Sequence, residues 1–186
     1  VCADFSRYQD APRGLPTGKR VIFYPGSTLG NMTPEAAKRY LQNLRQWMKS
    51  DGGVIIGIDL HKPEALLNAA YDDSQGITAA FNLNVLTHIN GLAGANFDLD
   101  NFAHRAFYNV EQLRIEMHLI SKLDHIVRIG ESAIAFSKGE SIHTENSYKY
   151  TVESFQQLAE SAGLSVRQSW LDEDRLFSVH YLEFRE

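Results

Sequence analysis

Short apolar runs alternate with a helical pattern in the first third of the chain. Val21 to Tyr24 is a continuous apolar run, which predicts a strand buried on both faces. A helix is predicted to begin after Thr33, because threonine caps helix N-termini and the following proline suits the first helical position. Apolar residues at helical spacing continue to Met48, and residues 54–60 form a second apolar run. This order predicts a parallel β-α-β unit.

The pattern changes in the middle of the chain. Residues 63–71 predict a short helix, and residues 77–89 are apolar nearly all round, which predicts a helix deep in the structure. Asn82 and Asn84 lie inside that stretch and need hydrogen-bond partners if they are buried there. The segment that follows is β-rich, with short strands predicted at residues 114–119, 125–129 and 134–136.

The last segment returns to a helix followed by strands. Thr151 is a predicted helix cap and Gly163 a predicted helix end, and residues 164–171 and 176–184 form two strands joined by a short turn. Strands joined in this way are antiparallel. We therefore predict an α/β fold, and a parallel sheet that ends in an antiparallel hairpin resembles the C-terminal half of a Rossmann-like class I methyltransferase sheet. The expected domains are a sheet core formed by residues 1–75 and 151–186, with a β-rich substrate-binding insertion at 76–150.

Composition and charge narrow the class of partner. The 186 residues carry a formal charge of -5, which argues against nucleic acid or an anionic membrane as the main partner and favours a small molecule. The single cysteine, Cys2, excludes an intrachain disulfide and favours a cytoplasmic location. No apolar stretch reaches the roughly 18 residues that a membrane helix needs. The opening residues, from Val1 to Phe5, are typical of a buried strand's tail, so we expect a fragment.

Three segments carry candidate chemistry. Glycines in the segment from Pro25 to Asn31 follow a predicted strand and would let the backbone approach a ligand, although a plain strand-to-helix turn has the same pattern. Tyr71 lies among small apolar residues, which is more typical of a core residue with a satisfied hydroxyl than of a ligand contact. Residues 139–150 are densely polar, which suits a solvated loop or a pocket wall. In an extended chain Glu145 and Ser147 share a face and could bond both nitrogens of an imidazole.

The sequence indicates neither a metal site nor a catalytic nucleophile. None of the seven histidines shows His-x-x-x-His spacing, and one cysteine cannot form a thiolate cluster. No Gly-x-Ser-x-Gly elbow occurs. We therefore expect no metal, and we treat the histidines as ordinary polar residues.

The same segments resemble the L-histidine Nα-methyltransferase family of ergothioneine biosynthesis. The resemblance runs from about Ala3 to the C-terminus and is carried by AAYDDSQGITAAFNLNVL and GESIHTENSYKY, with Arg114 to Leu119. It implies a Rossmann-like domain, a second domain that shapes a histidine pocket, S-adenosylmethionine as methyl donor and no metal. The implied activity is transfer of three methyl groups to the α-amino group of free L-histidine.

The resemblance also implies roles for individual residues. Asn31 and Tyr71 match residues that hold the substrate carboxylate, and Glu145 and Ser147 match the pair that reads the imidazole. The remaining matches are Gly26 and Thr28 beside the donor, Phe81 and Met117 around the substrate, and Asp4 and Phe5 near the adenine of S-adenosylmethionine. No general base is assigned.

The chain departs from the family pattern at its start. The family's N-terminal half, with the Gly-rich loop that wraps the donor, has no counterpart here. A fragment of this kind is expected to be inactive alone. Two alternatives stay open: a methyltransferase for another amino acid or small amine, and a non-catalytic ligand-binding remnant.

Overall fold

The chain divides into two compact units. The computed structural model describes Gly14 and residues 18–48 and 51–185. One unit, which we call the core unit, comprises Val1–His61 and Tyr148–Glu186, and the other, the insertion unit, comprises Lys62–Ser147. Within the described ranges, no helix is both long enough and apolar enough to cross a membrane.

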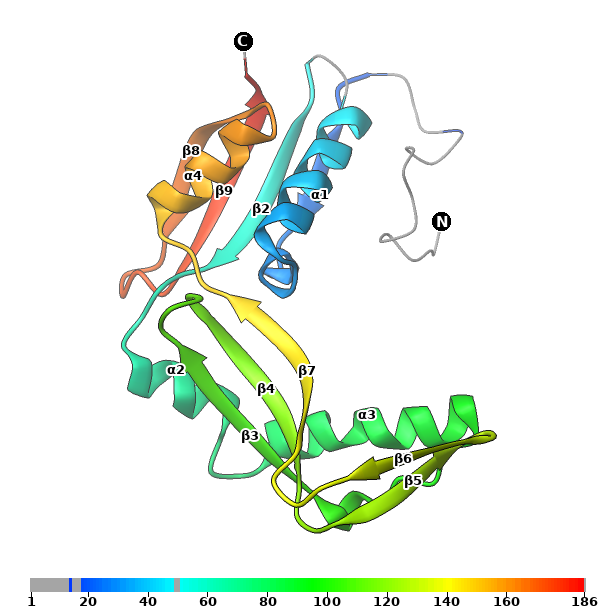
Figure 1. The fold of residues 1–186 in the computed structure, drawn as a ribbon. Helices are drawn as coiled ribbons and strands as arrows, with labels where there is room; N and C mark the ends of the chain where they lie inside the picture. The colour runs from blue at the N-terminus through cyan, green and yellow to red at the C-terminus, as the bar shows by residue number, and fades with distance from the viewer. Residues whose placement is uncertain (1–13, 15–17, 49–50, 186) are drawn as a thin grey trace. The chain divides into compact units, whose positions relative to one another are not determined.

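A four-stranded sheet forms the centre of the core unit (Figure 1). Its order is β1-β2-β9-β8, with β1 at Val21–Tyr24, β2 at Gly53–Asp59, β8 at Leu164–Leu171 and β9 at Phe177–Phe184. Strands β1 and β2 are parallel, whereas β9 is antiparallel to both β2 and β8. The predicted parallel pair and terminal antiparallel hairpin are therefore confirmed.

Two capped helices cover this sheet. In α1 (Pro34–Trp47) the Thr33 hydroxyl accepts a hydrogen bond from the Ala36 N–H at 3.3 Å, and α4 (Val152–Ser161) begins with a capping box between Thr151 and Ser154. One apolar cluster joins both helices to the sheet, and it includes Leu41, Leu44, Ile56, Phe155 and Leu182. The helix boundaries follow from sequence because the cap residues act locally.

The prediction that β1 is buried on both faces is wrong. Ile22 and Tyr24 pack against the core cluster, but Val21 is 49% exposed and Phe23 is 69% exposed. Successive strand side chains point to opposite faces, and no described segment covers the face that carries Val21 and Phe23.

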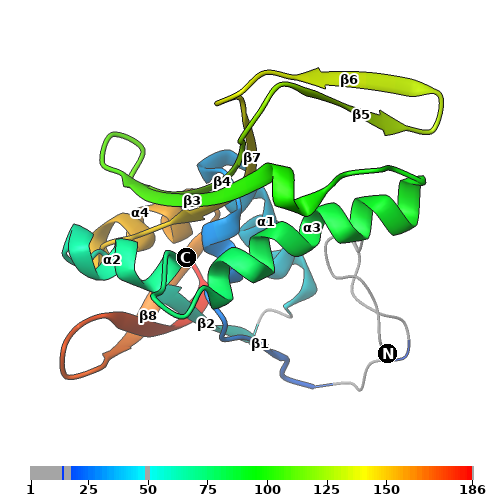
Figure 2. The ribbon, with the colours of Figure 1, turned by 90° about the horizontal axis from the view of Figure 1, so that it is seen from below.

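The insertion unit combines helices with short antiparallel strands (Figure 2). Strands β3, β4 and β7 form one sheet in that order, and β5 and β6 form a hairpin. The bounds are α2 Glu64–Tyr71, α3 Ile77–Ala93, η3 Leu99–Asn101, β3 Phe102–Asn109, β4 Arg114–Ser121, β5 His125–Ile129, β6 Ser132–Phe136 and β7 Ser141–Tyr148. Every strand predicted between residues 114 and 136 is present. The helices α2 and α3 run along β3 and β4.

Helix α3 lies nearer the surface than the sequence predicted. Asn82 and Leu86 are its buried residues, whereas Phe81 is 62% exposed and Asn84 is also exposed. An apolar helix was expected to be surrounded, but the described neighbours cover one side of it. Its N-terminus is held by Asp73, whose carboxylate accepts hydrogen bonds from two backbone N–H groups of the first turn.

A buried histidine in β9 makes the core unit sensitive to acid. His180 is 0% exposed and contacts the hydroxyls of Ser178 and Ser169 at 2.8 Å, and its ring lies tilted beside that of Phe155, with 4.6 Å between the ring centroids. Desolvation by burial lowers the pKa of His180 from 6.5 to about 4. The unfolded chain therefore takes up a proton near pH 6.5, which the folded chain resists until about pH 4.

We expect the free energy of unfolding to fall as the pH falls from about 6.5 to about 4. The loss attributable to His180 is on the order of 3 kcal/mol. Urea titrations across this range should show a shallower acid limb for His180→Gln, whereas His88→Gln on the exposed surface of α3 should follow the wild type. An unchanged acid limb in His180→Gln would contradict this assignment.

Candidate active site

The turn after β1 lies at the carboxyl edge of the parallel pair. Carboxyl ends of parallel strands meet at one edge of a sheet, where open α/β sheets bind ligands. Ser27 has a left-handed backbone with φ 54°, and its hydroxyl oxygen accepts a hydrogen bond from the Asp59 N–H at 2.8 Å. Thr28–Asn31 then form the short helix η2. The turn is thus tied to the end of β2, and it leaves Gly26 and Asn31 exposed.

Gly57 in β2 fixes how closely this turn approaches the sheet. A Cβ at Gly57 would overlap the carbonyl oxygen of Pro25 and would lie 2.7 Å from the Pro25 carbonyl carbon. Only glycine fits beneath the turn. Packing on β2 therefore sets the position of the backbone that carries Gly26, Thr28 and Asn31.

An ion pair with a buried lysine lies beyond the same edge. Lys149 Nζ is 2.7 Å from Asp59 Oδ2, and the Lys149 side chain is 0% exposed. The stretch after β2 also bonds the stretch after β7, because the His61 N–H donates to the Tyr150 carbonyl at 2.9 Å. The ion pair was not predicted from the sequence. The signal was a lysine between Tyr148 and Tyr150, two large aromatic residues that are themselves buried.

In the insertion unit, two of the predicted substrate contacts touch each other. The hydroxyls of Tyr71, the last residue of α2, and Ser147 in β7 are hydrogen-bonded at 2.9 Å. Met117 is 2% exposed and belongs to the apolar cluster against which Tyr71 packs. Glu145 lies two residues before Ser147 in the extended strand β7, so the two share a strand face.

The structure does not bring every predicted residue into this group. Phe81 lies on the exposed side of α3. Gly26, Thr28 and Asn31 belong to the core unit, whereas Tyr71, Met117, Glu145 and Ser147 belong to the insertion unit. Asp4 and Phe5 lie outside the described residues. The segment at 139–150 contributes a strand to the sheet, so it is not a loop.

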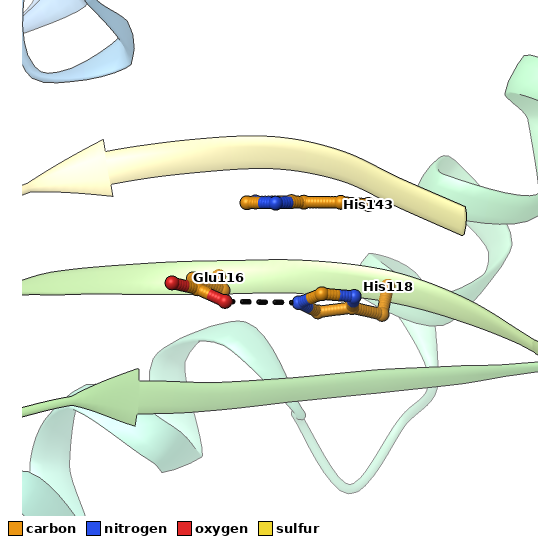
Figure 3. Close-up of side chains that lie close together, drawn as sticks. All are labelled: Glu116, His118 and His143. Carbon is orange, nitrogen blue, oxygen red and sulfur yellow. Dashed lines mark hydrogen bonds and ion pairs between the residues drawn. The ribbon is translucent and has the colours of Figure 1, made fainter. Parts of the chain in front are cut away.

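A second polar cluster lies across β4 and β7 (Figure 3). Glu116 accepts a hydrogen bond from the Arg114 guanidinium at 2.7 Å and contacts His118 Nε2 at 3.1 Å. Burial alone would raise the pKa of Glu116. Hydrogen bonds from Arg114, His118 and Asn109, together with the charge of Arg114, outweigh it and lower that pKa to about 2. The Glu116 carboxylate is therefore ionised and held in place by Arg114, His118 and Asn109.

This cluster has the residue types of a metal site but not its geometry. Ligand atoms of Glu116, His118 and His143 lie within 4.8 Å of one another. The two imidazole rings are stacked, however, with centroids 4.5 Å apart and planes 20° apart. Nitrogen lone pairs lie in the ring planes, so stacked rings do not aim at one ion, and Arg114 already neutralises the carboxylate. The cluster fits an internal ion-pair and stacking network better than a metal centre.

Several known proteins similar to this chain are named as methyltransferases. A family model described as a histidine-specific methyltransferase, SAM-dependent, matches residues 1–184. The chain is 37% identical to the histidine N-alpha-methyltransferase of Mycolicibacterium smegmatis, covering 92% of this chain and 54% of that protein. It is 30% identical to the L-tryptophan methyltransferase trpM of Psilocybe serbica, covering 82% and 43% respectively.

A more distant relative is the ergothioneine biosynthesis protein 1 of Schizosaccharomyces pombe, 25% identical over 86% of this chain and 21% of that protein. The chain thus spans about half the length, or less, of these curated relatives. The family match covers the turn after β1, the Tyr71 helix and β7 alike. The chain therefore belongs to the family of histidine-specific, S-adenosylmethionine-dependent methyltransferases.

Proposed function

We propose that the protein transfers methyl groups from S-adenosylmethionine to the α-amino group of L-histidine, giving N,N,N-trimethylhistidine in ergothioneine biosynthesis. The observation that carries the proposal is the match to the histidine-specific family across residues 1–184. The single cysteine is compatible with a cytoplasmic location.

The residues of the turn after β1 suit a position beside the methyl donor. When bound, S-adenosylmethionine supplies a methyl group on a positively charged sulfur. That sulfur is a good leaving group. Gly26 has no side chain and is exposed at the carboxyl edge of the sheet, so the backbone there can approach a ligand closely. The protein's main contribution is then orientation of the amine in line with the methyl group, which can lower a barrier by about 7–11 kcal/mol.

Selection of histidine depends on groups at both ends of the amino acid. Tyr71 would donate a hydrogen bond to the carboxylate, and Glu145 and Ser147 would bond the imidazole nitrogens. The hydrogen bond between the Tyr71 and Ser147 hydroxyls supports this arrangement. A hydroxyl both donates and accepts, so Ser147 can accept from an imidazole N–H and donate to Tyr71, which donates to the carboxylate.

A substrate panel tests the proposal. The full-length protein would be incubated with S-adenosylmethionine and with L-histidine, histamine, L-tryptophan or L-phenylalanine, and products read by mass spectrometry. We expect a gain of three methyl groups on histidine alone. Histamine should fail because it lacks the carboxylate, and phenylalanine because its ring offers no nitrogen to Glu145 and Ser147. Methylation of tryptophan in preference to histidine would overturn the assigned acceptor, and no methylation of any amine would overturn the activity.

A further inference from the structure

A fully buried amide begins a chain of hydrogen bonds in the insertion unit. Asn82 of α3 is 0% exposed, and its Nδ2 lies 3.1 Å from the His118 carbonyl oxygen and 3.0 Å from His104 Nδ1. A carbonyl oxygen can only accept, so the amide must turn its NH₂ group towards His118. Both amide hydrogens are then used, one on His118 and one on His104.

The amide fixes the tautomer of His104. Because Asn82 donates to Nδ1, that nitrogen carries the lone pair, and the proton of the neutral ring is on Nε2. Nε2 lies 2.9 Å from the carbonyl oxygen of Tyr71 and donates to it. The hydrogen bonds therefore all point the same way: Asn82 donates to His104, and His104 donates to Tyr71.

The receiving carbonyl is at the end of a helix. Tyr71 is the last residue of α2, where carbonyl groups have no partner within the helix. His104 supplies that partner from the neighbouring strand β3. Tyr71 is thus held twice, its backbone by His104 and its hydroxyl by Ser147.

We infer that His104, oriented by Asn82, is a positioning residue that sets the Tyr71 hydroxyl for the substrate carboxylate. The inference rests on the proposed function, in which Tyr71 contacts histidine. His104 bonds the Tyr71 backbone, so its effect on the reaction passes through Tyr71.

Kinetics of paired variants test the inference in the full-length enzyme. His104→Phe fills the space of the ring but has no donor, and we expect the KM for histidine to rise about tenfold with kcat and donor affinity unchanged. His104→Gln keeps an N–H near the position of Nε2 and should restore most of the loss. In a Tyr71→Phe background, His104→Phe should add little, because both changes act on one contact.

A matched control separates positioning from general loosening of α2. The Asn68 side-chain oxygen accepts a hydrogen bond from the Tyr108 N–H at 2.8 Å, so Asn68 also ties α2 to β3 without touching the Tyr71 carbonyl. Asn68→Ala should leave the KM for histidine close to the wild-type value. An equal rise in Asn68→Ala, or a full additional rise in the Tyr71→Phe background, would overturn the inference.

Nitrogen-15 NMR of the histidine ring gives a readout that does not depend on activity. We expect the neutral His104 ring to carry its proton on Nε2, and Asn82→Leu to weaken that preference. A ring protonated on Nδ1 in the wild type would overturn the inference whatever the substrate. An enzyme with the expected tautomer but no activity on histidine would overturn the proposed function instead.

Discussion

Gly57→Ala is expected to destabilise the protein by about 3 kcal/mol and to reduce methyl transfer to histidine about 100-fold. A Cβ at this position would overlap the Pro25 carbonyl oxygen and would lie 2.8 Å from the Phe177 ring. Neither neighbour is the free end of a flexible side chain, since one is backbone and the other an aromatic ring. The turn carrying Gly26 and Asn31 must move away from β2 to admit the methyl group.

Urea denaturation and steady-state kinetics on the same samples measure both effects. Gly91→Ala is the matched control, because Gly91 lies in α3 and a Cβ there would meet nothing within 4 Å. Alanine in a helix at such a site should leave stability equal to the wild type or slightly higher. Wild-type stability and activity in Gly57→Ala would show that the turn does not depend on this packing.

Glu145→Ala should weaken histidine binding by about 100-fold and leave S-adenosylmethionine binding unchanged. A hydrogen bond to a charged group contributes about 1.5–3 kcal/mol, and the imidazole loses that partner in the variant. The extended strand β7 places Glu145 on the same face as Ser147, so the two groups can act on one ring. The donor is expected to bind elsewhere, near the turn after β1.

Calorimetric titration of each variant with histidine and then with the donor separates the two effects. Glu131→Ala provides the control, since Glu131 is exposed in the turn between β5 and β6 of the same unit. It should bind both ligands as the wild type does. Equal losses of histidine and donor affinity in Glu145→Ala would contradict the assignment of Glu145 to the imidazole.

Much of the fold follows from local sequence signals. Caps at Thr33 and Thr151 place two helices correctly because a side-chain oxygen bonds the adjacent turn whatever the rest of the chain does. Short apolar runs predicted β1 and β2, and the turn before residue 176 predicted the antiparallel hairpin. Each of these signals lies within a few residues of the element that it predicts.

Burial and polar pairing were harder to predict because they depend on distant neighbours. Apolar composition alone placed α3 and both faces of β1 in the interior, but coverage depends on which segments pack there. Asp59 and Lys149 are 90 positions apart in the sequence, and no local sequence signal links them. His104 gave one usable signal, because it alternates with Phe102, Ala106 and Tyr108 on the apolar face of β3.

The central claim is that Tyr71, Glu145 and Ser147 receive one molecule of L-histidine. A crystal structure of the full-length protein with bound L-histidine tests it most directly. We predict the carboxylate within hydrogen-bond distance of the Tyr71 hydroxyl and the imidazole nitrogens against Glu145 and Ser147. Histidine bound away from these three side chains would contradict the account.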